Sequence, residues 1–244
     1  MQEAIIFIVG LIAGFLGATV GGGGMVSVPA LLLLGFSPQS AVAINQVGDI
    51  GAFISATGQY WKSKKIDWST AIPLVIITII CSIIGAQIMV SMQTGFLKTF
   101  IGITILAFLP FFFFGKNIGL KQRRTSKTKK TIGFTLYALL AIQGAIVGAG
   151  GATVILMIMM YFFGYEIIRG YATNTPAEFF SALIPAIIYA FYGFIKLWPA
   201  VIIFLGMLIG GYIGANIALQ KGSKWVKSLF TLVILLSVIK ILFF

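Results

Sequence analysis

The sequence predicts an all-α polytopic membrane protein made of two homologous, inverted repeats, each with four to five helical segments and a helix broken by glycines at mid-membrane. Three observations lead to this fold class. Of the 244 residues, 59% are hydrophobic and only 9% are charged, whereas about a quarter of the residues in a soluble domain are charged. Most of the apolar runs exceed the roughly 20 residues that span a bilayer. A glycine-rich pattern also occurs twice, once in each half of the chain.

The first apolar segment, residues 4–34, contains four consecutive glycines at 21–24. Each glycine costs roughly 1 kcal/mol relative to alanine in a helix interior, and lipid tolerates a broken helix only where the break is buried in protein or lines a polar cavity. Residues 144–151 (GAIVGAGG) repeat residues 17–24 (GATVGGGG). Two matched breaks predict a binding site at the interface of the repeats, as in secondary transporters.

The other segments complete the two halves. They are 37–60, 68–92 and 96–115 in the first half, and 131–163, 166–194, 197–220 and 225–244 in the second. Residues 84–88 (IGAQI) match 213–217 (IGANI), and residues 43–49 match 172–178, both with the same spacing between the halves. The chain therefore divides into an N-terminal membrane repeat (1–115), a basic linker (116–130) and a C-terminal membrane repeat (131–244).

Basic residues favour the inverted arrangement. If the linker is cytoplasmic and each glycine-broken segment folds back on itself, 14 basic residues lie inside and three outside. If each broken segment instead crosses once, the repeats are parallel and the division is 12 to five. The positive-inside rule favours the first count. A 31-residue segment would also make a helix of about 46 Å in a hydrocarbon core about 30 Å thick, so two shorter helices fit better.

The second segment of each half contains a predicted helix start. Ser37 precedes Pro38, which suits an N-cap followed by proline at the first helical position. Residues 175–178 (TPAE) have the form of a capping box. A helix that begins at membrane depth presents free N–H groups and the positive end of its dipole, which suits anion binding.

Two carboxyl groups lie inside membrane segments at matched positions, Asp49 and Glu178. An intramembrane carboxyl costs at least about 2.5 kcal/mol to place, so a functional role is the first hypothesis. The alternatives are a capping role for Glu178 and a hydrogen-bonding role for Asp49. Burial favours the neutral form of a carboxyl, so either could carry a coupled proton. Because Glu178 lies in the predicted capping box, which favours the ionised form, Asp49 is the preferred proton carrier.

Neutral polar residues and glycines supply the predicted substrate site. Amide and backbone N–H groups can replace the hydration shell of a small oxyanion, although buried amides can also simply bridge helices. The predicted substrate-binding residues are Gly21, Gly22, Gly23, Gly24, Asn45, Gln46, Gln143, Gly148, Gly150, Gly151, Asn174 and Thr175.

Composition argues against other functions. Histidine is absent and Cys81 is the only cysteine, so the usual ligands of a metal site are missing. We predict no metal, no cofactor and no enzymatic activity. The membrane segments leave no soluble domain for a nucleic-acid surface, and the net charge of +12 is instead assigned to the cytoplasmic face of a multi-pass protein in the cell membrane.

The glycine-rich segments at 14–24 and 144–151, each followed by a segment bearing Asn45 or Asn174, resemble the sulfite exporter TauE/SafE family, also called the toluene sulfonate uptake permease family. The resemblance covers nearly the whole chain. It implies a secondary transporter for a small sulfur-containing anion, such as sulfite, thiosulfate, sulfoacetate or another organosulfonate. The alternative is an anion channel that uses the same lining.

Overall fold

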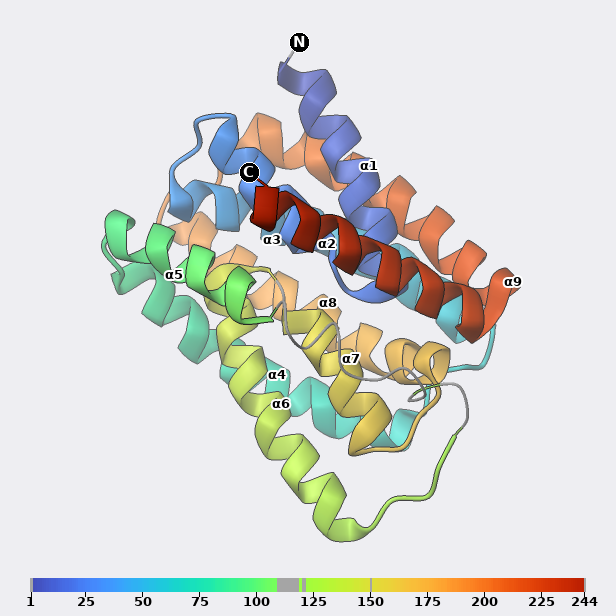
Figure 1. Ribbon diagram of the computed structural model, residues 1–244. Coiled ribbons are helices and arrows are strands. Elements are labelled where there is room, and N and C mark those ends of the chain that lie inside the picture. Colours follow the sequence, from blue (N-terminus) through green and yellow to red (C-terminus); the bar gives the residue numbers. More distant parts are fainter. Residues whose placement is uncertain (1, 109–118, 120–121, 150, 244) are drawn as a thin grey trace.

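The computed structural model describes residues 2–108, 119, 122–149 and 151–243. Over these residues the chain is helical, without strands. The first half contains α1 (Gln2–Val20), α2 (Gly23–Leu33), α3 (Pro38–Lys62), α4 (Trp68–Ser91) and α5 (Thr94–Phe108). The second half contains α6 (Lys127–Val147), α7 (Gly151–Tyr161), α8 (Ile167–Phe191) and α9 (Leu197–Phe243) (Figure 1).

The helix boundaries follow the expected segments closely. Helix α9 joins the two last segments, but its backbone is non-helical at Gly222 (φ 81°, ψ 175°), between the expected ranges. Helix α6 begins at Lys127, ahead of the expected segment, because the Ser126 hydroxyl accepts a hydrogen bond from the Lys129 N–H (3.3 Å) and caps the helix. Part of the predicted linker, at 116–118 and 120–121, lies outside the described residues.

Both glycine-broken segments are hairpins. At the open end of the first hairpin, Gln2 Nε2 donates to the carbonyl oxygen of Leu34 (3.4 Å), so the two ends of the segment lie together. At the open end of the second, the ammonium group of Lys129 lies 5.2 Å from the centre of the Tyr161 ring. The expectation that residues 4–34 and 131–163 fold back at their glycines is confirmed.

The helices pack in matching pairs. Helix α1 lies along α9 and α6 along α4, while α3 packs against α9 and α8 against α4; α3 and α8 also contact each other. Exchanging α1 with α6, α3 with α8 and α4 with α9 reproduces the same contacts, as two repeats related by a twofold axis would. In Figure 1, α1 descends from the N-terminus while α6 rises from its lower end. Inverted repeats require such opposite directions; the inverted relation itself stays a prediction.

Close approach at two glycines repeats the same geometry. A Cβ atom at Gly85 in α4 would lie 2.4 Å from the carbonyl oxygen of Ile142 in α6, and one at Gly214 in α9 would lie 2.6 Å from that of Phe15 in α1. Small residues allow helix backbones to approach closely in membranes. Both members of each contact occupy matched positions of the two repeats, so the glycines of the IGAQI and IGANI motifs serve helix packing.

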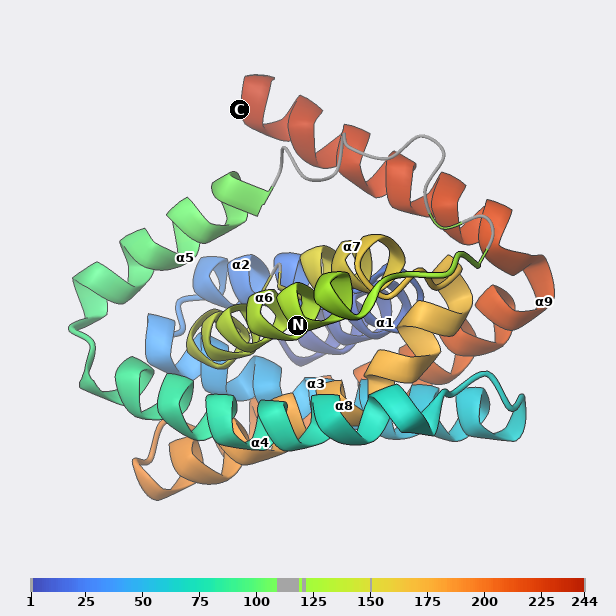
Figure 2. The ribbon, with the colours of Figure 1, turned by 90° about the horizontal axis from the view of Figure 1, so that it is seen from below.

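Four helices of the described chain are long and apolar enough to span a bilayer: α1, α4, α6 and the first part of α9. Helices α3 and α8 have 25 residues each but carry many of the buried polar side chains. They lie between the apolar helices, and α5 and the second part of α9 lean over the face opposite α4 (Figure 2). The chain is thus a multi-pass membrane protein with a polar centre.

Candidate functional site

The tips of the two hairpins meet at the centre of the molecule. A Cβ atom at Gly24 would lie 1.8 Å from the carbonyl oxygen of Gly148, and one at Gly21 would lie 2.9 Å from the carbonyl carbon of Ala152. Gly21 and Gly148 also have positive φ angles of 77° and 65°, which glycine adopts without steric cost. The glycines therefore turn each hairpin and let the two tips touch.

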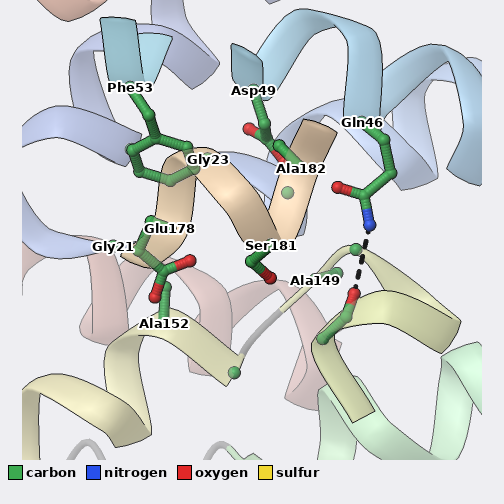
Figure 3. Close-up of a pocket in the computed structure, with 15 residues that line it drawn as sticks. Gly21, Gly23, Gln46, Asp49, Phe53, Ala149, Ala152, Glu178, Ser181 and Ala182 are labelled. Carbon is green, nitrogen blue, oxygen red and sulfur yellow. Dashed lines mark hydrogen bonds between the residues drawn. The ribbon is translucent and has the colours of Figure 1, made fainter. Parts of the chain in front are cut away.

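A cavity lies where the tips meet, between α3 and α8 (Figure 3). Its volume, taken as the space that the centre of a water molecule can reach, is about 40 Å³. One water needs roughly 10–15 Å³ by this measure, so the cavity holds a few waters or one small ion. Its lining consists of Gly17, Gly21, Gly23, Gly24, Gln46, Asp49, Phe53, Gly144, Gly148, Ala149, Gly151, Ala152, Glu178, Ser181 and Ala182.

The first residues of α2 and α7 belong to this lining. They are Gly23 and Gly24 in one hairpin, and Gly151 and Ala152 in the other. The first N–H groups of a helix have no partner within that helix, and the helix dipole is positive at this end. Two helix N-termini therefore offer donors to an anion at the cavity.

The carbonyl groups at the C-terminal ends of α1 and α6 accept hydrogen bonds from side chains of other helices. At the end of α1, Tyr60 Oη donates to Ala18 O (2.9 Å) and Tyr171 Oη donates to Gly17 O. The Thr153 hydroxyl donates to Gly21 O (3.3 Å). These bonds neutralise the negative end of α1, where the last carbonyls would otherwise be buried without partners.

The end of α6 is bound in the same way. Gln46 Nε2 donates to Gly144 O (3.3 Å), Tyr189 Oη donates to Ala145 O, and Asn45 Nδ2 donates to Gly148 O (3.0 Å). The amides of Asn45 and Gln46, predicted to bind substrate, thus also hold the second hairpin. In Figure 3 the dashed line marks the hydrogen bond from the Gln46 amide, at the edge of the cavity, to the carbonyl oxygen of Gly144.

The buried tyrosines Tyr60 and Tyr189 are not among the predicted site residues. Tyr60 and Tyr189 have the same spacing between the halves as the IGAQI and IGANI motifs, and this repetition of a tyrosine could have identified them. Both are fully buried, and the carbonyls that they bind, at Ala18 and Ala145, also occupy matched positions of the glycine-rich repeat.

Asp49 and Glu178 face the same cavity, from α3 and α8 respectively (Figure 3). Each accepts a hydrogen bond from the asparagine one helical turn before it. The Asn45 Nδ2 to Asp49 Oδ2 distance is 2.8 Å, and the Asn174 Nδ2 to Glu178 Oε1 distance is 2.7 Å. The fold therefore brings together the two carboxyl groups that occupy matched positions in the sequence.

The two asparagines differ in the partners of their amide oxygens. Asn45 Oδ1 accepts a hydrogen bond from the hydroxyl of Ser27 in α2. Asn174 Oδ1 is buried and has no hydrogen-bond partner among the described residues. Helix α7 corresponds to α2, and the match of residues 144–151 with 17–24 places Val154 where α2 has Ser27. Valine has no hydroxyl to donate.

The predicted capping box at 175–178 is wrong. Helix α8 runs from Ile167 to Phe191 without interruption, with Pro176 inside it. Proline lacks the N–H that would bond the carbonyl of Ala172, and the Thr175 hydroxyl donates to that carbonyl instead (2.9 Å). The helix starts that face the cavity are those of α2 and α7. The N-cap predicted at Ser37 is confirmed, since its hydroxyl accepts from the Ser40 N–H (3.3 Å).

Not all of the predicted substrate-binding residues line the cavity. The residues that do not line the cavity are Gly22, Asn45, Gln143, Asn174 and Thr175, and Gly150 lies outside the described residues. Gln143 Nε2 donates to Ala149 O (3.1 Å). The cavity is also lined by residues outside the predicted set, chiefly Gly17, Gly144 and Ser181.

Polar contacts join the two repeats at one end of the molecule. Lys65 Nζ lies 3.9 Å from Glu166 Oε1, and the Arg169 guanidinium lies 3.9 Å from Asp67 Oδ2. These pairs link the loop before α4 to the start of α8. Both are partly exposed, so each is worth little alone.

The electrostatics of this contact favour an ionised Asp67. Burial opposes ionisation of Asp67, but hydrogen bonds from Ser69 and Tyr165 and the charge of Arg169 outweigh it and lower the pKa of Asp67. Burial, together with the bond to Asp67, raises the pKa of Tyr165 to about 12. Tyr165 therefore stays a neutral donor to an ionised carboxylate over the physiological pH range.

Comparison with known proteins identifies relatives over the whole chain. The model of the sulfite exporter TauE/SafE family matches residues 6–241. A probable membrane transporter protein, ORF9, of Sinorhizobium is 23% identical, over 98% of this chain and 92% of its own. One from Haemophilus influenzae is 23% identical over 92% and 88%, and YunE of Bacillus subtilis is 23% identical over 97% and 96%. No solved structure gives a significant match.

Proposed function

The chain belongs to the sulfite exporter TauE/SafE family of membrane transporters, and from this premise we propose that it is a secondary transporter of a small sulfur-containing anion across the cytoplasmic membrane. Sulfite, thiosulfate, sulfoacetate and other organosulfonates are the candidate substrates. The basic end of the molecule, with Lys65 and Arg169, faces the cytoplasm in this proposal, and the anion occupies the cavity between the hairpin tips.

The observation that carries the proposal is the meeting of two helix N-termini at one small cavity. The backbone N–H groups at the starts of α2 and α7 supply donors and positive dipole ends without a buried lysine or arginine. A cavity of about 40 Å³ accommodates a compact oxyanion. A longer organosulfonate requires the hairpin tips to move apart.

The carboxyl groups of Asp49 and Glu178 at the cavity link anion binding to protonation. Ionised Asp49 and Glu178 would repel a bound anion, since like charges in one site disfavour each other. The anion is therefore bound when at least one of these carboxyl groups is neutral. Anion and proton then occupy the site together, and the proton gradient drives transport.

Counterflow of labelled anion in proteoliposomes tests this function. Purified protein preloaded with unlabelled sulfite should take up labelled sulfite transiently and saturably, because a carrier exchanges bound substrate. Thiosulfate and sulfoacetate added outside report on the substrate class by competition. Flux without counterflow would establish the alternative, an anion channel, and absence of both would contradict transport of these anions.

Alanine variants locate the site. A Cβ atom at Gly144 would meet nothing closer than Ser181 Oγ, at 3.8 Å, and one at Gly17 would meet Gly23 Cα at 3.7 Å, so each methyl group fits the fold while narrowing the cavity. The methyl group takes space from the anion in the small cavity, and we expect roughly tenfold weaker apparent affinity, about 1.4 kcal/mol. Gly58→Ala is the control, because Gly58 lies in α3 with nothing within 4 Å of its Cβ position. Unchanged affinity in Gly17→Ala and Gly144→Ala would place the substrate elsewhere.

A further inference from the structure

The turn between α3 and α4 forms an open groove at the basic end of the molecule. The groove has a volume of about 450 Å³ and is lined by Trp61, Lys62, Lys64, Ile66 and Trp68. Its size lies within the range of small-molecule sites. The two indole rings meet edge to face, with centroids 6.0 Å apart, and are 64% and 42% exposed. Such tryptophans are typical of the level of the lipid headgroups.

Lys64 is held in an unfavourable backbone conformation. Its φ angle is 56°, and it is the one non-glycine residue with positive φ in the described part of the chain. The left-handed conformation costs roughly 1–2 kcal/mol for a residue with a Cβ. The matched position of the other repeat is Gly193, with a φ angle of 73°. Both turns have a residue in the left-handed region at this position, so a glycine would satisfy the fold and the lysine is the costlier residue there.

The lysines of this turn differ in their pairing. Lys65 pairs with Glu166 at 3.9 Å, but neither Lys62 nor Lys64 has an ion-pair partner among the described residues. The matching turn at the opposite end carries Phe191 and Gly193 at the positions of these two lysines. Two unpaired cations between exposed tryptophans thus occur at only one of these two matched turns.

We propose that this groove binds the headgroup of an anionic phospholipid from the cytoplasmic leaflet. Lys62 and Lys64 contact the phosphate, and the rings of Trp61 and Trp68 lie against the glycerol and the first part of the acyl chains. Basic pockets at the cytoplasmic end of membrane helices suit anionic headgroups. Charge complementarity and the exposed rings select a lipid over a free anion, because the rings offer apolar surface that a free phosphate cannot cover. The site is separate from the cavity between the hairpins.

Thermal stability with added lipid tests the proposal. Purified protein in a neutral detergent is mixed with phosphatidylglycerol, phosphatidylcholine or soluble glycerol phosphate. A ligand that binds the folded state raises the melting temperature, so phosphatidylglycerol should raise that of the wild type by several degrees, and the other two should not. An equal rise with glycerol phosphate would overturn the assignment to a lipid.

Lys64→Gly is the decisive variant, because it removes the charge while the backbone conformation becomes easier to adopt. Its melting temperature without lipid should equal or exceed that of the wild type, and its half-saturating concentration of phosphatidylglycerol should rise at least fivefold. Lys62→Gln should act in the same direction. Lys196→Gln, at the opposite end, is the matched control and should respond like the wild type. An unchanged lipid response in both groove variants would overturn the site.

Discussion

At the scale of single residues, one missing hydroxyl distinguishes the two carboxyl groups. Both polar atoms of the Asn45 amide have partners: Oδ1 accepts from Ser27, and Nδ2 donates to Gly148 O and to Asp49. The amide is therefore fixed with its nitrogen as a donor to Asp49. The oxygen of the Asn174 amide has no hydrogen-bond partner among the described residues, and Val154 stands where Ser27 stands in the first repeat. This amide can turn over, so that its oxygen accepts a hydrogen bond from the protonated carboxyl of Glu178.

The preference for Asp49 as proton carrier depended on a capping role for Glu178, and that role is wrong. We now propose Glu178, which is 7% exposed and whose asparagine can serve both the ionised and the neutral carboxyl. Glu178→Gln should abolish the response of sulfite uptake to a pH gradient while preserving counterflow, and Asp49→Asn should keep that response. Uptake in proteoliposomes with and without an imposed gradient measures both. Coupling lost in Asp49→Asn alone would return the role to Asp49.

At the scale of elements, the hairpins depend on side chains that satisfy their interrupted ends. Tyr60 binds the first hairpin from its own repeat and Tyr171 binds it from the other, while Tyr189 and Gln46 do the same for the second. The hydrogen bonds within one repeat are kept when that repeat moves as a unit. The hydrogen bonds between repeats must change if the repeats move relative to each other during transport.

Removal of a phenol hydroxyl within a repeat should therefore destabilise the fold. Tyr60→Phe and Tyr189→Phe each leave a buried carbonyl without its donor, which costs about 1–3 kcal/mol. The melting temperature of the purified protein should fall in both variants. Tyr192→Phe is the control, since Tyr192 is 53% exposed. If the two buried variants melt like the control, the tyrosine bonds do not hold the hairpins.

At the scale of the whole molecule, the hairpins place the ends of the helices on two faces. One face gathers the ends of the first hairpin and the turn after α4, where Gln39 Nε2 donates to Met92 O and Thr94 Oγ1. The other gathers Lys65, Asp67, Glu166 and Arg169. The break in α9 lies toward this second face, since Val226 packs in one cluster with Ile66.

Thiol labelling of intact cells tests the orientation of the two faces. In a Cys81→Ala background, a membrane-impermeant reagent should label Gln93→Cys from outside and Lys221→Cys only after the cells are opened. Both positions are exposed; Gln93 lies in the turn between α4 and α5, and Lys221 lies beside the break in α9. The reverse pattern would invert the orientation, and labelling of both from outside would contradict the inverted topology.

The membrane class, the two hairpins and the matched carboxyl groups could be predicted from the sequence, because segment length, glycine content and the spacing of repeats can be read along the chain without knowing which helices are in contact. The first apolar run, with its four glycines, was too long and too broken to cross once. Tertiary packing was needed to establish that the tips touch at Gly24 and Gly148, that buried tyrosines cap the helix ends, and that α8 continues through Pro176. Thr175 followed by Pro176 is typical of a helix start, because proline inside a helix removes a backbone hydrogen bond. The helix continues here because the Thr175 hydroxyl donates to the carbonyl that Pro176 leaves without a donor.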